Sequence, residues 1–258
     1  MDLGIAGLNA VVLGGSSGLG LGIATALAQE KAQVTISSST AAKLEMGASH
    51  IKAASGATAK VALCDLHDPT SVANFLATVP SADILVLNGG GPPPGSVQAI
   101  SEETWLKQFR SLFLSHTTIA NAYLPAMKQK KFGRIILVIS SGVQQPIPNL
   151  GISNALRASL VGWAKTLSRE VAADGITVNS VAPGRVRTPR LTNVDAARAK
   201  AENVSVDVIE TRSLTEIPMG RFGTIEEFGA AAAFLASRQA AYTTGSIVRV
   251  DGGLIASH

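Results

Sequence analysis

Short apolar runs alternate with stretches of helical periodicity along the whole 258-residue chain. The apolar runs are rich in β-branched residues and do not alternate with polar positions, which is typical of parallel strands buried on both faces. Seven such runs predict strands: NAVVLGG at 9–15, AQVTIS at 32–37, AKVALCDL at 59–66, ADILVLNGG at 82–90, GRIILVISS at 133–141, GITVNSVAP at 175–183 and SIVRVDGG at 246–253.

Helical periodicity follows several of these runs, at 19–30, 102–130, 152–173 and 225–237. Repeated strand–helix–strand units with right-handed crossovers place helices on both faces of one parallel sheet. No linker, repeat or low-complexity segment interrupts the pattern. The sequence therefore predicts an α/β protein with a doubly wound parallel sheet, a Rossmann-type three-layer sandwich, in which residues 1–258 form a single domain.

Residues 186–222 resist this scheme, because they are irregular and rich in charge, with helical patches such as VDAARAKAEN. An insertion between the sixth strand and the next helix commonly lies over a site at the carboxyl ends of the strands. We expect a lid or substrate segment at 186–222. An ordinary surface excursion is the alternative.

Composition favours a compact protein, with 46% hydrophobic and 16% charged residues. In this chain of net charge +4 the densest basic stretch is KQKKFGR at 128–134. Its cations complement the dipole at a helix end, and no basic face with interleaved aromatic residues accompanies it to indicate nucleic-acid binding. Cys64 is the single cysteine, which excludes an internal disulfide and a cysteine-based metal cage. Its place in an apolar strand predicts a buried, inert thiol.

The apolar runs, such as IILVI and AAAAFLA, are too short to span a bilayer. The chain starts with an acid at position 2 and has no cationic leader. We therefore expect a cytoplasmic protein with no membrane partner.

The segment VVLGGSSGLG at 11–20 places Gly14, Gly18 and Gly20 between the first strand and the first helix. Glycines at such a junction let the backbone turn tightly and approach a pyrophosphate, which rests on the helix N-terminus. The spacing G-x-x-x-G-x-G is wider than the usual dinucleotide fingerprint. By itself this loop is weak evidence for a dinucleotide.

The second strand ends in Ser37, Ser38, Ser39 and Thr40, without the carboxylate that usually holds a ribose 2′-hydroxyl. Hydroxyl and amide donors carry no negative charge and therefore tolerate a 2′-phosphate better than a carboxylate does. This favours NADP over NAD. Lys43 is a candidate helper or an ordinary helix-surface lysine. Asp65 is a candidate partner for the adenine amino group or a cap for the following helix.

With these features the chain resembles the short-chain dehydrogenase/reductase family from Gly14 to Gly253, and the 3-oxoacyl-(acyl carrier protein) reductases in particular. The resemblance rests on four segments: GGSSGLG at 14–20, NGGG at 88–91 where the family usually has N-N-A-G, SREVAADGITVNSVAPG at 168–184, and GRFGTIEEFGAAAAFLAS with TTGSIVRVDGG within 220–253.

The resemblance implies hydride transfer between a nicotinamide cofactor and a carbonyl/alcohol pair, with a small molecule or an acyl thioester as substrate. It also implies a homo-oligomer, a tetramer or dimer, assembled through the helices at 102–130 and 152–173. The implied cofactor contacts are Gly14, Ser16, Ser17, Gly18, Leu19, Gly20, Asp65, Leu66, Asn88, Gly89, Gly90, Pro183, Gly184, Val186 and Thr188, the last two reaching the nicotinamide carboxamide.

The chain departs from the family at the catalytic positions. Family enzymes use an Asn, a Ser, and the Tyr and Lys of Y-x-x-x-K. Counting back from the matching segments puts Leu112 at the Asn position, Ser153 at the Tyr position and Arg157 at the Lys position. The family serine matches Ser141, with Ser140 a second candidate. At 88–95 the proline-filled loop NGGGPPPG replaces the family's usual loop and is stiffer than it.

The chain has only two tyrosines, Tyr123 and Tyr242, and neither is placed by the sequence to supply the missing acid. A serine hydroxyl is a far weaker acid, and an arginine does not release its proton under ordinary conditions. We predict a slow or specialised oxidoreductase in which Arg157 binds ribose hydroxyls and stabilises an oxyanion. Ser141 and Ser153 would then hold the carbonyl oxygen or a relay water.

Three alternatives remain open from the sequence. In a cofactor-binding pseudoenzyme, Ser153 would be a helix N-cap and Arg157 would form an ion pair on the helix face. A different reaction in the same cleft, such as dehydration or imine reduction, is the second. His116, one helical turn beyond Leu112, faces the site or is an ordinary surface or satisfied histidine.

Overall fold

The computed structural model describes residues 2–257 and confirms the predicted fold class. Seven strands form one sheet in the order β3-β2-β1-β4-β5-β6-β7, and every neighbouring pair is parallel. The strand order reverses between β1 and β4, and in such sheets ligands bind outside the carboxyl ends of the strands at that point. The strands are β1 Asn9–Val12, β2 Gln33–Ser38, β3 Lys60–Leu63, β4 Ile84–Leu87, β5 Gly133–Val138, β6 Ile176–Pro183 and β7 Ile247–Val250.

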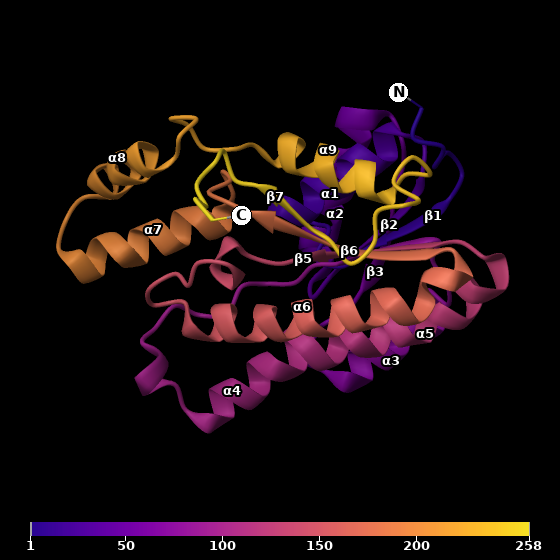
Figure 1. Cartoon of the computed structure of the whole chain (residues 1–258), viewed down its shortest axis with the longest axis horizontal. Coiled ribbons are helices and arrows are strands. Elements are labelled where there is room, and N and C mark those ends of the chain that lie inside the picture. The colour runs from indigo at the N-terminus through magenta and orange to yellow at the C-terminus, as the bar shows by residue number, and fades with distance from the viewer. Residues whose placement is uncertain (1, 258) are drawn as a thin grey trace.

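Helices cover both faces of the sheet, with α1, α2 and α9 on one side and α3, α5 and α6 on the other (Figure 1). The structure adds α2 and α3 to the predicted helices and divides the predicted helix at 102–130 into α4, a π-helical turn at Arg110–Leu114, and α5. The helices are α1 Gly18–Gln29, α2 Ala41–Ser55, α3 Pro69–Thr78, α4 Glu102–Phe109, α5 Ser115–Lys130, α6 Gly151–Val171, α7 Pro189–Glu202, α8 Val206–Glu216 and α9 Ile225–Ala236.

The hydrophobic core consists of two layers that sandwich the sheet. On one face Ile23 and Phe228 pack from α1 and α9, and on the other Phe75 and Ile119 pack from α3 and α5. These four side chains are at most 1% exposed. The expectation of burial on both faces fails at the edge strand β3, where Val61 is 50% exposed.

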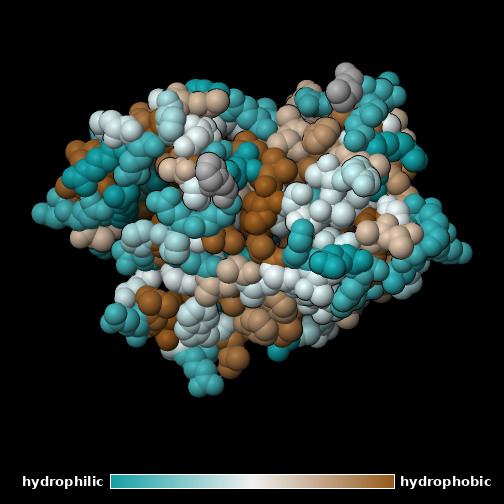
Figure 2. Space-filling view, viewed as in Figure 1, coloured by the Kyte–Doolittle hydropathy of each residue, from teal (hydrophilic) through white to brown (hydrophobic). Residues whose placement is uncertain are grey.

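The segment 186–222 forms α7 and α8, which extend beyond the end of the sheet on the left of Figure 1. Arg185, at the exit of β6, forms an ion pair with the buried Asp195 of α7 and so fixes this helix to the sheet. In the view of Figure 2 hydrophilic side chains dominate the outer surface of this region. Hydrophobic side chains lie mainly in the middle of the face.

The basic stretch at 128–134 has the structural role predicted for it. Lys128 and Lys130 lie in the last turn of α5, where cations complement the helix dipole. Lys130 pairs with Asp83 at 2.6 Å. Within residues 2–257 no helix is both long and apolar enough to cross a membrane.

Candidate active site

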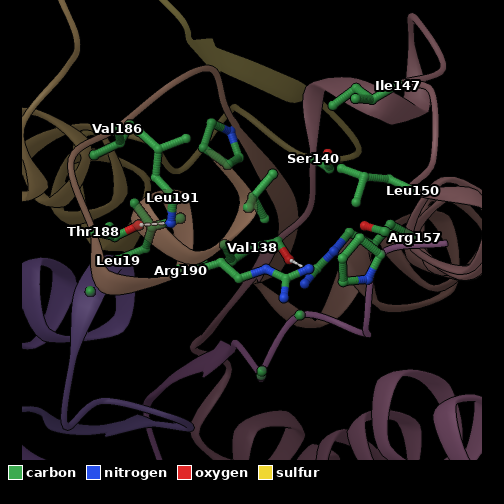
Figure 3. Close-up of a pocket in the computed structure, with 18 of the residues that line it drawn as sticks. Leu19, Val138, Ser140, Ile147, Leu150, Arg157, Val186, Thr188, Arg190 and Leu191 are labelled. Carbon is green, nitrogen blue, oxygen red and sulfur yellow. Dashed lines mark hydrogen bonds between the residues drawn. The ribbon is translucent and has the colours of Figure 1, made fainter. Parts of the chain in front are cut away.

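One cavity of about 1250 Å³ opens at the carboxyl ends of the strands. Residues that follow each of the seven strands contribute to its wall, together with α7. Separate crossovers therefore deliver side chains to one place, because the carboxyl ends of parallel strands share one edge of the sheet. Figure 3 shows part of this wall, with residues of the β5, α6 and α7 regions facing each other.

The glycine loop has the backbone geometry of a phosphate cradle. Gly14 and Gly18 have φ values of +58° and +54°, which favour glycine. Asn88 holds the loop from β4, because its Nδ2 donates hydrogen bonds to the carbonyls of Leu13 and Gly14 at 3.1 and 3.2 Å. A Cβ at Gly20 would lie 2.3 Å from the Gly14 carbonyl oxygen. Only glycine therefore lets the helix approach the loop so closely.

The N-terminus of α1 opens into the cavity. Its N-cap, Ser17, has extended backbone and makes no side-chain capping hydrogen bond. Ser17, Gly18 and Leu19 all line the cavity. Free N–H groups at the positive end of a helix dipole suit an anion, and the residues present therefore fit a pyrophosphate.

The remaining predicted cofactor contacts lie along the same cavity, with two exceptions. Gly20 does not line the wall and instead makes the close helix–loop contact described above. Ser37 is 1% exposed and does not line it either. The predicted contacts that do line the cavity are Gly14, Ser16, Ser17, Gly18, Leu19, Ser38, Ser39, Asp65, Leu66, Asn88, Gly89, Gly90, Arg157, Pro183, Gly184, Val186 and Thr188.

At the end of β2 the wall carries hydroxyls and a cation. Ser38, Ser39 and Lys43 line the cavity there. The nearby Asp65 accepts a hydrogen bond from the His67 backbone N–H at 2.9 Å. Asp65 is not the cap of α3, because Asp68 is the N-cap residue and accepts from the Thr70 backbone N–H.

Arg157 comes from the second turn of α6 and is 7% exposed. Its Nη1 donates a hydrogen bond of 2.6 Å to the carbonyl of Val138, at the end of β5 (Figure 3). Burial, with the charge of Arg190 as a second cause, lowers the pKa of Arg157 to about 10, so the side chain is cationic at neutral pH. The alternative of an ion pair on the helix face is wrong: among residues 2–257 it has no carboxylate partner.

Three serines face the cavity near Arg157. Ser140 and Ser141 follow β5, and Ser153 lies in the first turn of α6. The Ser140 hydroxyl accepts a hydrogen bond from the Gly142 backbone N–H at 3.1 Å. The alternative in which Ser153 caps the helix is wrong, because α6 begins at Gly151 and its N-cap residue is Leu150.

Leu112 lines the cavity within the π-helical turn between α4 and α5. Such turns are often found at functional sites. The Leu112 carbonyl forms a 2.8 Å hydrogen bond with Nδ1 of His116. His116 is 1% exposed, so the alternative of a surface histidine is wrong, and it does not line the cavity. Its Nε2 has no hydrogen-bond partner among the described residues, and burial lowers its pKa.

Neither tyrosine lines the cavity. Tyr123 is fully buried in α5, where its hydroxyl donates to the Val79 carbonyl at 2.7 Å. Tyr242 is fully exposed, on the segment before β7. The site therefore offers serine hydroxyls and an arginine, with no phenol beside them.

Two loops form an apolar wall of the cavity and are bonded to each other. The Gly95 N–H of the proline-filled loop donates to the Asn149 carbonyl at 2.8 Å, and Gly95 forms a β-bridge with Leu150. Ile147 and Leu150 of the second loop lie opposite α7 in Figure 3. The bridge and the prolines limit the conformations of both loops.

The sequence did not identify Arg190, which lies in the first turn of α7 and lines the cavity. Its Nη2 donates a 2.5 Å hydrogen bond to the Pro92 carbonyl, and burial lowers its pKa. One feature of the sequence marks it: the helix starts at Thr188-Pro189, so a cation stands where the helix dipole disfavours it.

Fold and site together define a dinucleotide-binding protein of the doubly wound class. A family model described as enoyl-(acyl carrier protein) reductase matches residues 14–255. The chain is 36% identical over 251 residues to the 3-oxoacyl-(acyl-carrier-protein) reductase FabG of Escherichia coli, covering 95% of this chain and 96% of that one. It is 33% identical over 260 residues to the D-beta-hydroxybutyrate dehydrogenase of Cupriavidus necator, covering 97% and 98%.

Among solved structures, the L-sorbose reductase of Gluconobacter frateurii in complex with NADPH and L-sorbose superposes with a TM-score of 0.92 at 30% identity, with both chains fully covered. The chain belongs to the short-chain dehydrogenase/reductase family, as its sequence motifs predicted. It is an oxidoreductase similar to the 3-oxoacyl reductases.

Proposed function

We propose that the protein is an NADP(H)-dependent oxidoreductase that interconverts a carbonyl and an alcohol without a tyrosine acid. The observation that carries the proposal is the position of Arg157, which is buried at the cavity beside Ser140, Ser141 and Ser153 and has no carboxylate partner among residues 2–257. A decayed site would not be expected to keep a desolvated cation aimed at the place where negative charge develops in a carbonyl reduction.

The glycine loop and the N-terminus of α1 would hold the pyrophosphate of the cofactor. Ser38, Ser39 and Lys43 would hold the adenosine 2′-phosphate, which favours NADP over NAD because no acid repels it. The solved L-sorbose reductase, bound to NADPH, supports this choice. When bound, the nicotinamide supplies or accepts the hydride.

The chain's own side chains would then handle the oxygen of the substrate. Ser141 and Ser153 orient the carbonyl oxygen by hydrogen bonds. Arg157 stabilises the negative charge on that oxygen and binds ribose hydroxyls, while water delivers the proton. A positioned general acid contributes roughly 10²–10⁴ in rate, so we expect turnover slower than that of a tyrosine-containing relative by a factor within this range.

The segment 186–222 would act as a cover for the substrate. Its helix α7 supplies Arg190, Leu191 and Val194 to the cavity wall. The ion pair between Arg185 and Asp195 would hold this cover in register with the sheet. We also expect a homo-oligomer built through α5 and α6, which size-exclusion chromatography with light scattering would measure.

Calorimetric titration with NADPH and with NADH tests the cofactor assignment. We expect NADPH to bind more tightly, and we expect NADPH oxidation with one or more members of a carbonyl panel. Arg157→Ala and Ser141→Ala should each lower kcat/KM, and Ser140→Ala tests the second candidate for the family serine. Cofactor binding without turnover across the panel would favour a pseudoenzyme, and full activity of both variants would refute the assigned roles.

A further inference from the structure

The cavity carries two arginines without carboxylate partners. Of the other arginines in its wall, Arg185 pairs with Asp195, and Arg198 pairs with Glu202 at 2.7 Å. Arg157 and Arg190 have no carboxylate within 4.0 Å in the part of the chain that the structure describes.

The two guanidiniums come from different elements and point toward each other across the cavity (Figure 3). Each donates one hydrogen bond to a backbone carbonyl, Arg157 to Val138 and Arg190 to Pro92. A guanidinium has five N–H donors, so most donors of both groups remain available. Their proximity is costly, and the charge of Arg190 contributes to the lowered pKa of Arg157.

An anion between the two groups would remove this repulsion. A carboxylate fits this position, because its two oxygens accept paired hydrogen bonds from a planar guanidinium. The surrounding wall includes Ile147, Pro148 and Leu150, which suit an apolar chain. Arg190 reaches the loop that follows β4, whereas the cradle for the pyrophosphate lies at the N-terminus of α1.

Building on the proposed function, we infer that the substrate is an oxo or hydroxy acid with a free carboxylate. Arg157 and Arg190 would bind the carboxylate, and the apolar wall would contact the rest of the chain. Such a substrate differs from an acyl thioester, which carries no free carboxylate at the reacting end. Arg190 is then a specificity-determining residue.

Binding of hexanoate and of its neutral analogue hexanamide, measured by ligand-observed NMR titration, tests this inference. We expect hexanoate to bind at least about tenfold more tightly, because charge-assisted hydrogen bonds to guanidinium are lost in the amide. Arg190→Gln should abolish this preference. Arg198→Gln is the matched control, since Arg198 lines the same cavity but already has a carboxylate partner, and it should keep the preference.

Turnover gives an independent readout with 3-oxohexanoate and methyl 3-oxohexanoate. Arg190→Gln should raise KM for the acid, leave the ester unaffected, and leave NADPH affinity unchanged. Equal affinity of the wild-type protein for hexanoate and hexanamide would overturn the inference. Weaker NADPH binding by Arg190→Gln with unchanged hexanoate binding would also overturn it, because the arginine would then serve a cofactor phosphate.

Failure of the proposed function gives a different result. If the wild-type protein bound neither NADPH nor NADH but still preferred hexanoate over hexanamide, the oxidoreductase proposal would be wrong. The anion site would be supported.

Discussion

The buried ion pair between Asp195 and Arg185 makes a sharp prediction about helix α7, which lines the cavity. Asp195 is 1% exposed in the middle of α7, and its Oδ1 pairs with Nη2 of Arg185. Few other α7 residues are buried, so this carboxylate is a main attachment of the helix. We predict that Asp195→Asn, which removes the charge and keeps the size, destabilises α7 before it destabilises the sheet.

The magnitude follows from what the variant leaves behind. Removing one partner of a buried pair costs about 3–5 kcal/mol, because the other charge stays buried. The Arg185 side chain keeps 17% exposure, and its guanidinium lies 5.5 Å from the centroid of the Phe222 ring. We therefore expect Asp195→Asn to cost about 2–3 kcal/mol of stability, at or below the low end of that range.

Hydrogen–deuterium exchange of peptides from 186–222 is the assay that resolves this effect. Exchange should accelerate there and remain unchanged in β4 and β5. If the loss also reaches global unfolding, Tm should fall by about 5–10 °C. Asp207→Asn, an exposed acid in the first turn of α8, is the control. Equal exchange in the two variants would refute the view that the ion pair fixes the helix.

Four further predictions concern single residues. Gly20→Ala should weaken NADPH binding by at least about tenfold, because its Cβ would lie 2.3 Å from a backbone oxygen of the glycine loop. Gly162→Ala, with open space around it on α6, should instead stabilise the protein by about 0.5–1 kcal/mol. Burial and then the charge of Asp65 raise the pKa of Cys64 to about 12, so the thiol should resist Ellman's reagent at neutral pH until the protein is denatured; rapid native labelling would contradict this. The Arg221 guanidinium lowers the pKa of Glu227 to about 2. The stabilising contribution of ionised Glu227 is therefore complete above about pH 4.5 and lost as the pH falls through 2. The Tm difference between wild type and Glu227→Gln should vanish at that acidic end.

The sequence predicted the strands well because each is a short β-branched run between helical segments. It missed α2, which is weakly amphipathic, and α3, which is only ten residues long. It also predicted a uniform helix at 102–130, where the structure has a π-helical turn. The burial of β3 was overestimated because local composition does not tell which strand occupies an edge.

The candidate site was predictable where its residues are local in the chain. The cavity-lining residues of the glycine loop and of the NGGG segment lie within a few positions of each other in the chain. A sequence motif is therefore enough to place them along the cavity. Arg190 was missed because its contact with Pro92 joins segments far apart in the sequence. The roles of Ser153 and Arg157 were left open for the same reason.

The sequence by itself determined the class of fold and the glycine loop at the first crossover. These properties depend on residue type and spacing along one segment. Only the tertiary structure decided that Arg157 is buried with no carboxylate partner in the described part of the chain, and that Arg190 faces it from another helix. Both depend on which elements meet at the carboxyl edge of the sheet, and this meeting is set by the strand order and not by any local pattern.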